Sequence, residues 1–150
     1  MQQCAVLPRG IGKPIPIERK EQDMAENEKK TSYSLTWTVT DDMTAKRIGS
    51  AGAKIFSTPN MVALMEDAAL ELAKEYLVDE ETTVGAEIRC KHIAPTPVGM
   101  KVTATATLRS IERKKLWFDI EVHDEKGKCG EGEHLRVIIN SKRFPKKSGS

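Results

Sequence analysis

Aromatic residues, cysteines and long apolar runs are all scarce in this chain of 150 residues. Aromatic side chains make up only 5% of it, so stacking platforms for single-stranded nucleic acid are not expected. The apolar runs are only a handful of residues long, too short for a membrane-spanning helix. The 24 basic residues are balanced by 22 acidic ones, which argues against a concentrated basic surface. We therefore expect neither nucleic acid nor a membrane as a partner.

The three cysteines, Cys4, Cys90 and Cys129, lack the CxxC spacing of zinc sites, and the histidines lack metal-ligand spacing as well. An odd and sparse set of cysteines does not form a disulfide framework. The N-terminus has no charged segment followed by an apolar stretch, the pattern of a secretory signal. We therefore expect a reducing compartment, the cytoplasm, and no bound metal or other cofactor.

The chain divides into an arm, one domain and a tail. Residues 1–30 contain three prolines and a mostly charged run, bury little apolar surface and are expected to be a flexible arm. Residues 31–144 carry the patterns of secondary structure and have the length of one ordinary domain. Residues 145–150 are expected to be a polar tail.

One long helix is predicted in the middle of the chain. Thr58 is expected to be its N-cap and Pro59 its first residue, where the missing N–H costs no hydrogen bond. Apolar residues recur with helical spacing to about Leu77; they are Met61, Leu64, Met65, Ala68, Leu72 and Tyr76. Glu66 lies at the border of this apolar stripe, where a carboxylate must be paired, hydrogen-bonded or raised in pKa.

The remaining segments predict about five strands. Their expected ranges are 31–40, 84–93, 100–109, 116–123 and 132–142. Short connections join the last four, which favours an antiparallel sheet. One apolar helix among these strands indicates an α+β domain in which the sheet wraps around the helix. Dimerisation would cover the open edges of such a sheet.

Alternation along the strands assigns residues to faces. In residues 84–93, one face is expected to hold Val84, Ala86, Ile88, Cys90 and His92. In the last strand, alternation places Leu135, Val137 and Ile139 together on one face. His123 and His134 have polar neighbours and are interpreted as surface or partner contacts.

Three side chains are candidates for chemistry, and each also has a purely structural explanation. Glu66 is either a reactive carboxylate or a boundary residue that reaches water or a base. His92 is either a reactive imidazole or a satisfied core residue. Thr58 caps a helix whose N-terminal N–H groups could also hold a carbonyl oxygen or an oxyanion. The sequence has no GxSxG, GxGxxG, HExxH or P-loop motif.

Two stretches resemble a known family. IFSTPNMVALMEDAA (residues 55–69) and VGAEIRCKHIAPTPVG (84–99), with the strands that follow, are similar to hotdog-fold thioesterases of the fluoroacetyl-CoA thioesterase type. The similarity extends over about residues 31–144. It implies a long helix packed in a curved antiparallel sheet, a dimer with active sites at the subunit interface, and hydrolysis of acyl-CoA thioesters.

The resemblance also assigns roles to residues. It places the family's catalytic threonine, glutamate and histidine on Thr58, Glu66 and His92. Gly85 matches the glycine whose N–H helps to hold substrate or water, and Arg136 lies in an HxR element as a further substrate-binding residue. Glu66 would activate water or attack the thioester directly, with His92 as the partner acid or base.

One segment departs from the family pattern. The fluoroacetyl-CoA-selective member has bulky aromatic and proline residues just before the helix, whereas residues 49–54 here read GSAGAK. We therefore expect a different short or medium acyl group. Alternatives to a thioesterase are a non-catalytic acyl-CoA or metabolite binder, a hydratase or dehydratase acting on acyl thioesters, and a structural dimer module.

Overall fold

The computed structural model describes residues 28–45 and 53–144. Its elements are, in chain order, β1 (Ser32–Thr38), the 3-10 helix η2 (Asp41–Met43), α2 (Thr58–Ala73), the 3-10 helix η4 (Lys74–Tyr76), β2 (Glu81–His92), β3 (Lys101–Glu112), β4 (Lys115–Asp124) and β5 (Gly127–Asn140). The tail and all but three residues of the expected arm lie outside the described residues.

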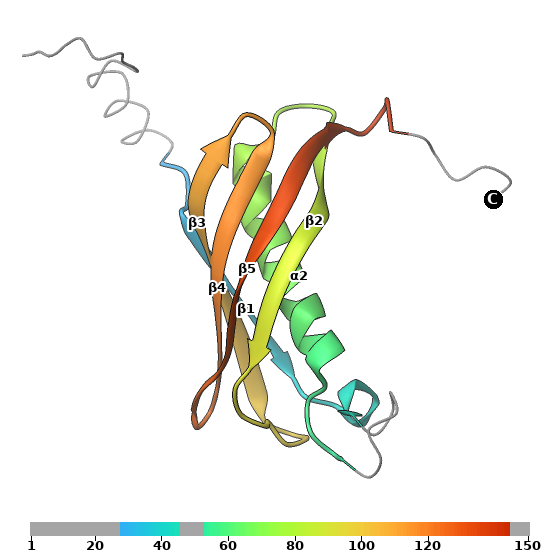
Figure 1. Ribbon diagram of the computed structural model, residues 1–150, viewed down its shortest axis with the longest axis vertical. Coiled ribbons are helices and arrows are strands. Elements are labelled where there is room, and N and C mark those ends of the chain that lie inside the picture. The colour runs from blue at the N-terminus through green and yellow to red at the C-terminus, as the bar shows by residue number, and fades with distance from the viewer. Residues whose placement is uncertain (1–27, 46–52, 145–150) are drawn as a thin grey trace, which may run out of the picture.

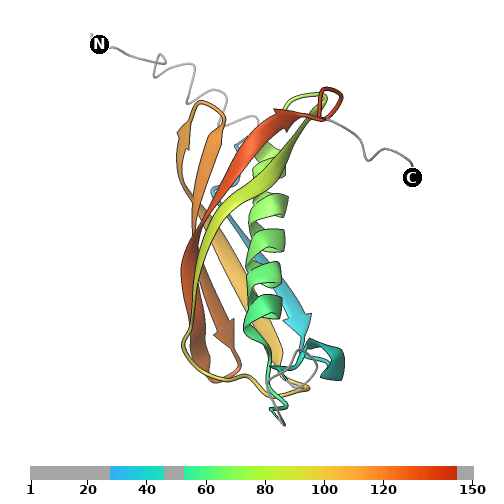
Figure 2. The same ribbon diagram turned by 45° about the vertical axis from the view of Figure 1, so that its right-hand side comes forward.

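The five strands form one antiparallel sheet in the order β1-β3-β4-β5-β2. Figures 1 and 2 show this sheet curving around one side of α2, which runs along its concave face. The expected α+β architecture of one long helix and about five antiparallel strands is thus confirmed. Strand β2 pairs only with β5 and forms one edge of the sheet, while β1 forms the other. In the described residues, no helix is long and apolar enough to cross a membrane.

The core lies between α2 and the concave face of the sheet. The fully buried residues of the helix are Met61, Leu64, Met65, Ala68, Ala69, Leu72 and Ala73. They pack against alternate residues of β3 and β4, among them Val102, Ala104, Ala106, Leu116, Phe118, Ile120 and Val122. Each large apolar side chain buried in this way contributes about 1.5–3 kcal/mol to folding. This core fixes the helix along the sheet and so fixes where its polar residues emerge.

The start of α2 differs from the prediction by one residue. Ser57 has an extended backbone (φ −82°, ψ 153°), and its hydroxyl accepts a hydrogen bond from the Asn60 N–H at 3.2 Å. Ser57 is therefore the N-cap, and Thr58 is the first helical residue. The assignment of Thr58 as N-cap was wrong because the preceding serine also has a capping side chain. The hydroxyl of Thr58 is consequently free for another partner.

A β-bulge changes the expected alternation in β2. The register against β5 shifts between Gly85 and Glu87, so Ala86 is an extra residue on this strand. Because a bulge inserts one residue, the faces before and after it are out of phase. Gly85 therefore faces α2. The expectation that Val84 and Ala86 share a face with His92 was wrong.

Strand β5 turns a polar pair toward the helix. Its residues Leu135, Val137 and Ile139 share a face, as alternation predicts. That face is the outer one, because the intervening residues His134 and Arg136 are buried on the helix side. The inner face of β5 is therefore an unusual place in this core, where two nitrogen-rich side chains lie beneath α2.

Candidate active site

Thr58 and His92 form a hydrogen-bonded pair at the N-terminal end of α2. Thr58 lies in the first helical turn and His92 ends β2, and Thr58 Oγ1 is 2.8 Å from His92 Nδ1. Figure 1 shows the first turn of α2 and the end of β2 side by side in the lower part of the molecule. Two residues that are 34 positions apart in sequence thus meet where a helix terminus offers free N–H groups.

The second ring nitrogen of His92 is unpartnered. His92 Nε2 is buried and has no hydrogen-bond partner among the described residues. Burial lowers the pKa of His92 below its ordinary value of 6.5, and a backbone hydrogen bond with Ala94 opposes this only in part. The imidazole is therefore neutral at neutral pH. A buried nitrogen without a partner costs folding free energy, so such groups are concentrated at functional sites.

Glu66 lies at a separate place, beside Gly85. Glu66 is half-buried on α2, two helical turns beyond Thr58. A Cβ atom built on Gly85 would lie 2.9 Å from Glu66 Oε2, 3.2 Å from His134 Cε1 and 3.5 Å from Arg136 Nη1. The missing side chain of Gly85 therefore leaves room where a carboxylate, an imidazole and a guanidinium converge.

Arg136 is buried and held at three points. Its Nε donates to Thr83 Oγ1 at 2.8 Å, its Nη2 donates to the Thr83 carbonyl at 3.1 Å, and its Nη1 donates to His134 Nε2 at 3.2 Å. Burial lowers the pKa of Arg136, while the nearby Glu66 raises it. Across the described ranges, no ion pair or hydrogen bond joins Arg136 to Glu66. The Glu66 carboxylate is thus close to the fixed positive charge of Arg136 but does not form an ion pair with it.

Sequence reasoning missed His134, which is only 1% exposed. The interpretation of this residue as a surface or partner contact was wrong because its polar partners, Arg136 and the Glu87 carbonyl, lie inside the fold and not at its surface. The spacing of His134 and Arg136 was the available signal, since residues two apart on a strand share a face. His123, by contrast, is exposed as expected.

Within one chain the candidate residues form two groups rather than one. Thr58 pairs with His92, and Glu66 lies with Gly85 and Arg136. Eight helical residues separate Thr58 from Glu66, a rise of about 12 Å. No hydrogen bond or ion pair joins Glu66 to His92 in the part of the chain that is described. Each group holds part of the expected machinery, and neither holds all of it.

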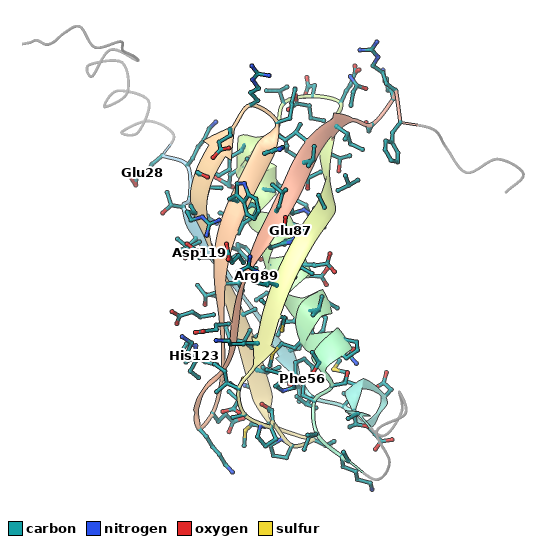
Figure 3. All side chains as sticks on the ribbon, viewed as in Figure 1. Glu28, Phe56, Glu87, Arg89, Asp119 and His123 are labelled. Carbon is teal, nitrogen blue, oxygen red and sulfur yellow. The ribbon has the colours of Figure 1, made fainter. Side chains whose placement is uncertain are left out.

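The outer face of the sheet carries a groove of a different kind. It is lined by side chains of β2 to β5, several of which Figure 3 labels. Arg89 pairs with Glu133 at 3.1 Å, and Arg109 pairs with both Glu133 and Asp119 at 2.9 Å. Exposed ion pairs of this kind are worth about 0–1 kcal/mol each. Because these charges satisfy one another on the side away from α2, we place the candidate site on the helix side.

The residues also bear on metal binding. In the described ranges, no group of three or more histidine, cysteine or acidic side chains lies close enough together to hold a metal ion. The chemistry available at the two groups is instead that of a free carboxylate, an unpartnered imidazole nitrogen, a buried guanidinium and a glycine opening. These are the groups needed for acid–base or nucleophilic attack on an acyl carbon.

One long helix along the concave face of an antiparallel sheet of five described strands defines the class as a hotdog-fold protein. The family model for fluoroacetyl-CoA-specific thioesterases, FlK, matches residues 39–142, which is more than half of the chain. The chain therefore belongs to this thioesterase family.

Individual relatives agree with this assignment. A fluoroacetyl-CoA thioesterase from Streptantibioticus cattleyicolor is 38% identical over 91 residues, which are 61% of this chain and 66% of the relative, just under two thirds of its length. The crystal structure of a mutant of FlK in complex with fluoroacetate and CoA has a TM-score of 0.71 and 31% identity, covering 76% of this chain and 96% of that one. A Thermus thermophilus member of the thioesterase superfamily has a TM-score of 0.70 at 24% identity, covering 75% of this chain and 83% of that one, and supports the fold alone.

Proposed function

We propose that the chain hydrolyses an acyl-CoA thioester to the free acid and CoA, with Glu66, His92 and Thr58 as its catalytic residues. The opening at Gly85 beside an unpaired carboxylate is the observation that carries this proposal. The fluoroacetyl-CoA thioesterase relatives, one of them solved with fluoroacetate and CoA, support CoA thioesters as the substrate class.

The active form is a homodimer in which β2 pairs with β2 of a second copy. Among the described residues, this edge strand has no neighbour on one side, and exposed apolar residues flank it, with Val78 at 70% and Ile93 at 52% exposure. In an antiparallel pair centred on Arg89, with Ala86 as the extra residue of the bulge, Gly85 of one copy lies opposite His92 of the other. Self-pairing of the edge is thus the arrangement that brings the two groups of catalytic residues together.

Glu66 performs the attack on the thioester. A carbonyl placed in the opening at Gly85 lies beside Glu66 Oε2, so the carboxylate can activate a water molecule or attack the acyl carbon itself. The Gly85 N–H and the Arg136 guanidinium stabilise the negative charge that develops on the carbonyl oxygen. Direct attack expels the CoA thiolate and leaves a mixed anhydride on Glu66, which water then opens. Transfer of oxygen-18 from labelled Glu66 to the acid product in a single turnover identifies this route, with water attacking the Glu66 carbon of the anhydride.

His92 transfers protons during the reaction, and Thr58 orients it. With Nδ1 bonded to Thr58, the ring is fixed in orientation, and its free Nε2 can give a proton to, or take one from, the reacting group. The lowered pKa keeps this imidazole neutral and available as a base at neutral pH. Thr58 is then the residue that orients His92 and the substrate.

The acyl group is a short or medium one without selectivity for fluorine. The segment 49–54 that precedes α2 contains only small residues and one lysine, and residues 49–52 lie outside the described part of the chain. We expect comparable kcat/KM values for acetyl-, butyryl- and hexanoyl-CoA and no large preference for fluoroacetyl-CoA. A strong preference for fluoroacetyl-CoA over acetyl-CoA would contradict this assignment.

The test of the proposed function is hydrolysis of an acyl-CoA panel, followed through the released thiol. Wild-type protein should hydrolyse at least one member, and Glu66→Gln, which keeps the size of the side chain but removes its charge, should lower kcat by about 1,000-fold. Glu121→Gln, on the exposed outer face, is the matched control and should leave kcat unchanged. Tight acyl-CoA binding without turnover, unaffected by Glu66→Gln, would instead establish a non-catalytic binder.

A further inference from the structure

We propose that His134 is a positioning residue for this reaction: it accepts a hydrogen bond from Arg136 and so holds the guanidinium beside Gly85 without an ion pair to Glu66. The proposal rests on the proposed function of Glu66. His134 borders the opening only with a carbon atom, Cε1, while both of its nitrogens have other partners, so it acts on the reaction through Arg136.

The two partners of His134 define its protonation. His134 Nδ1 is 2.8 Å from the Glu87 carbonyl, and Nε2 is 3.2 Å from Arg136 Nη1. A carbonyl oxygen can only accept and a guanidinium can only donate, so Nδ1 carries the proton and Nε2 is the acceptor. Because His134 is 1% exposed, both nitrogens are shielded from bulk solvent. The neutral Nδ1–H tautomer is therefore the only form that satisfies both contacts.

The charges around His134 keep it neutral. Burial is the main cause that lowers the pKa of His134, and the positive charge of Arg136 on β5 lowers it further. Glu66 on α2 and the hydrogen bond to the Glu87 carbonyl act in the opposite direction but do not outweigh these causes. The imidazole thus remains an acceptor for Arg136 throughout the neutral pH range.

This acceptor matters because Arg136 has an alternative partner. Nη1 lies 3.5 Å from the position that a Cβ on Gly85 would take, and Glu66 Oε2 lies 2.9 Å from the same point. A guanidinium released from His134 could turn to form an ion pair with Glu66, which would neutralise the attacking carboxylate and fill the opening. The hydrogen bonds that Arg136 donates to Thr83 and His134 together prevent this movement.

The second bond of His134 holds the backbone. Glu87 directly follows the bulge residue Ala86, so the contact from His134 Nδ1 to the Glu87 carbonyl fixes the strand where Gly85 is turned inward. The two nitrogens therefore have separable tasks. Asparagine places an amide near the position of Nδ1, whereas glutamine places one near the position of Nε2.

The experiment compares His134→Asn with His134→Gln. His134→Asn keeps a donor for Glu87 and loses the acceptor for Arg136, so we expect kcat to fall about tenfold with little change in KM. His134→Gln keeps the acceptor and should recover most of this loss, even if its Tm is the lower of the two. His123→Asn, a substitution of the same kind on the exposed outer face, is the control and should leave kcat unchanged.

A double mutant tests whether His134 acts through Arg136. The variant His134→Asn/Arg136→Ala should be no slower than Arg136→Ala alone, because the residue being positioned is already gone. The proposal is overturned if the kcat reductions of the two single variants multiply in the double mutant. It is also overturned if His134→Asn and His134→Gln have equal kcat. Nitrogen-15 NMR of the histidines in the wild-type protein should show the Nδ1–H tautomer for His134, and an Nε2–H or doubly protonated ring would also overturn it.

These outcomes are distinct from failure of the proposed function. If the wild-type protein hydrolyses no acyl-CoA in the panel, both the proposed function and a role for His134 in the reaction are refuted. If the wild-type protein is active and Glu66→Gln is inactive, but His134→Asn retains full kcat, only the inference about His134 is refuted.

Discussion

At the scale of single residues, the site depends on groups that are left without a partner. The Glu66 carboxylate lies near Arg136 but forms no ion pair with it among the described residues, and His92 Nε2 is buried without a hydrogen bond. The buried Nε2 of His92 reduces stability, since an unsatisfied buried group is costly. Both groups lie where the proposed substrate would supply the missing contacts.

The opening at Gly85 gives a direct residue-scale prediction. Gly85→Ala should lower kcat by about 100-fold, because the new methyl group would displace Glu66 Oε2 from a position 2.9 Å away and occupy the place of the thioester carbonyl. The Tm should change little, because the nearest atom is the end of a flexible side chain. Unchanged kcat in a folded Gly85→Ala protein would show that the carbonyl does not bind there.

Thr58 and Ser57 differ in role although both are hydroxyl residues at the start of α2. Ser57→Ala should lower the free energy of unfolding by about 1 kcal/mol through loss of the N-cap, with kcat changed less than stability. Thr58→Val should do the reverse, lowering kcat about tenfold while leaving stability nearly unchanged, because it removes only the bond to His92. Urea denaturation and thioester assays on the two variants measure both effects. The opposite pattern would return the capping role to Thr58.

At the scale of secondary-structure elements, the sequence predicted the number and order of elements but not every face. Periodicity identified α2 and the inner faces of β3 and β4 because apolar residues alternate there without interruption. It failed in β2, where the bulge at Ala86 shifts the phase and places Gly85 inward. It also failed for His134, because its spacing from Arg136 shows only that the two residues share a face, and the partners that bury that face lie far along the chain.

Glycines on the inner face of β5 set how closely the elements approach. A Cβ on Gly132 would collide with the backbone oxygen of Arg89 on β2 and would lie 2.8 Å from Met65 Cε on α2. A Cβ on Gly130 would meet the end of the flexible Met61 side chain instead, with its nearest atom, Sδ, at 2.5 Å. We therefore expect Gly132→Ala to be the more destabilising of the two, by about 2 kcal/mol or more, because the backbone cannot move aside. Equal unfolding midpoints for the two variants would contradict this packing.

At the scale of the whole molecule, the buried His134 and the half-buried His92 make stability depend on pH. Burial lowers the pKa of both His92 and His134, so the folded protein binds fewer protons than the unfolded chain below pH 6.5. The stability they confer is complete above this pH and is lost as the pH falls toward their folded pKa values. We expect the Tm to drop between pH 7 and pH 5, and to drop less in His134→Gln. An unchanged slope in that variant would refute this origin.

The geometry of α2 and β2 keeps the candidate residues of one chain apart. The helix rise places Thr58 and Glu66 about 12 Å apart along the axis of α2, and β2 leaves one edge open. Motifs in the sequence could indicate the candidate catalytic residues, but the distance between these residues follows only from the fold. A two-fold pairing of β2 edges would convert two incomplete groups per chain into two complete sites per dimer.

The most direct test of this account is complementation between inactive variants. Glu66→Gln and His92→Asn, each nearly inactive alone, are unfolded together, refolded as a mixture and assayed for acyl-CoA hydrolysis. Random pairing gives heterodimers with one intact site, so the mixture should recover about a quarter of wild-type activity. A mixture of Glu66→Gln with Arg136→Ala, which lie in the same group, should recover none. Heterodimers seen by native mass spectrometry with no recovered activity in the first mixture would contradict a site shared between two chains.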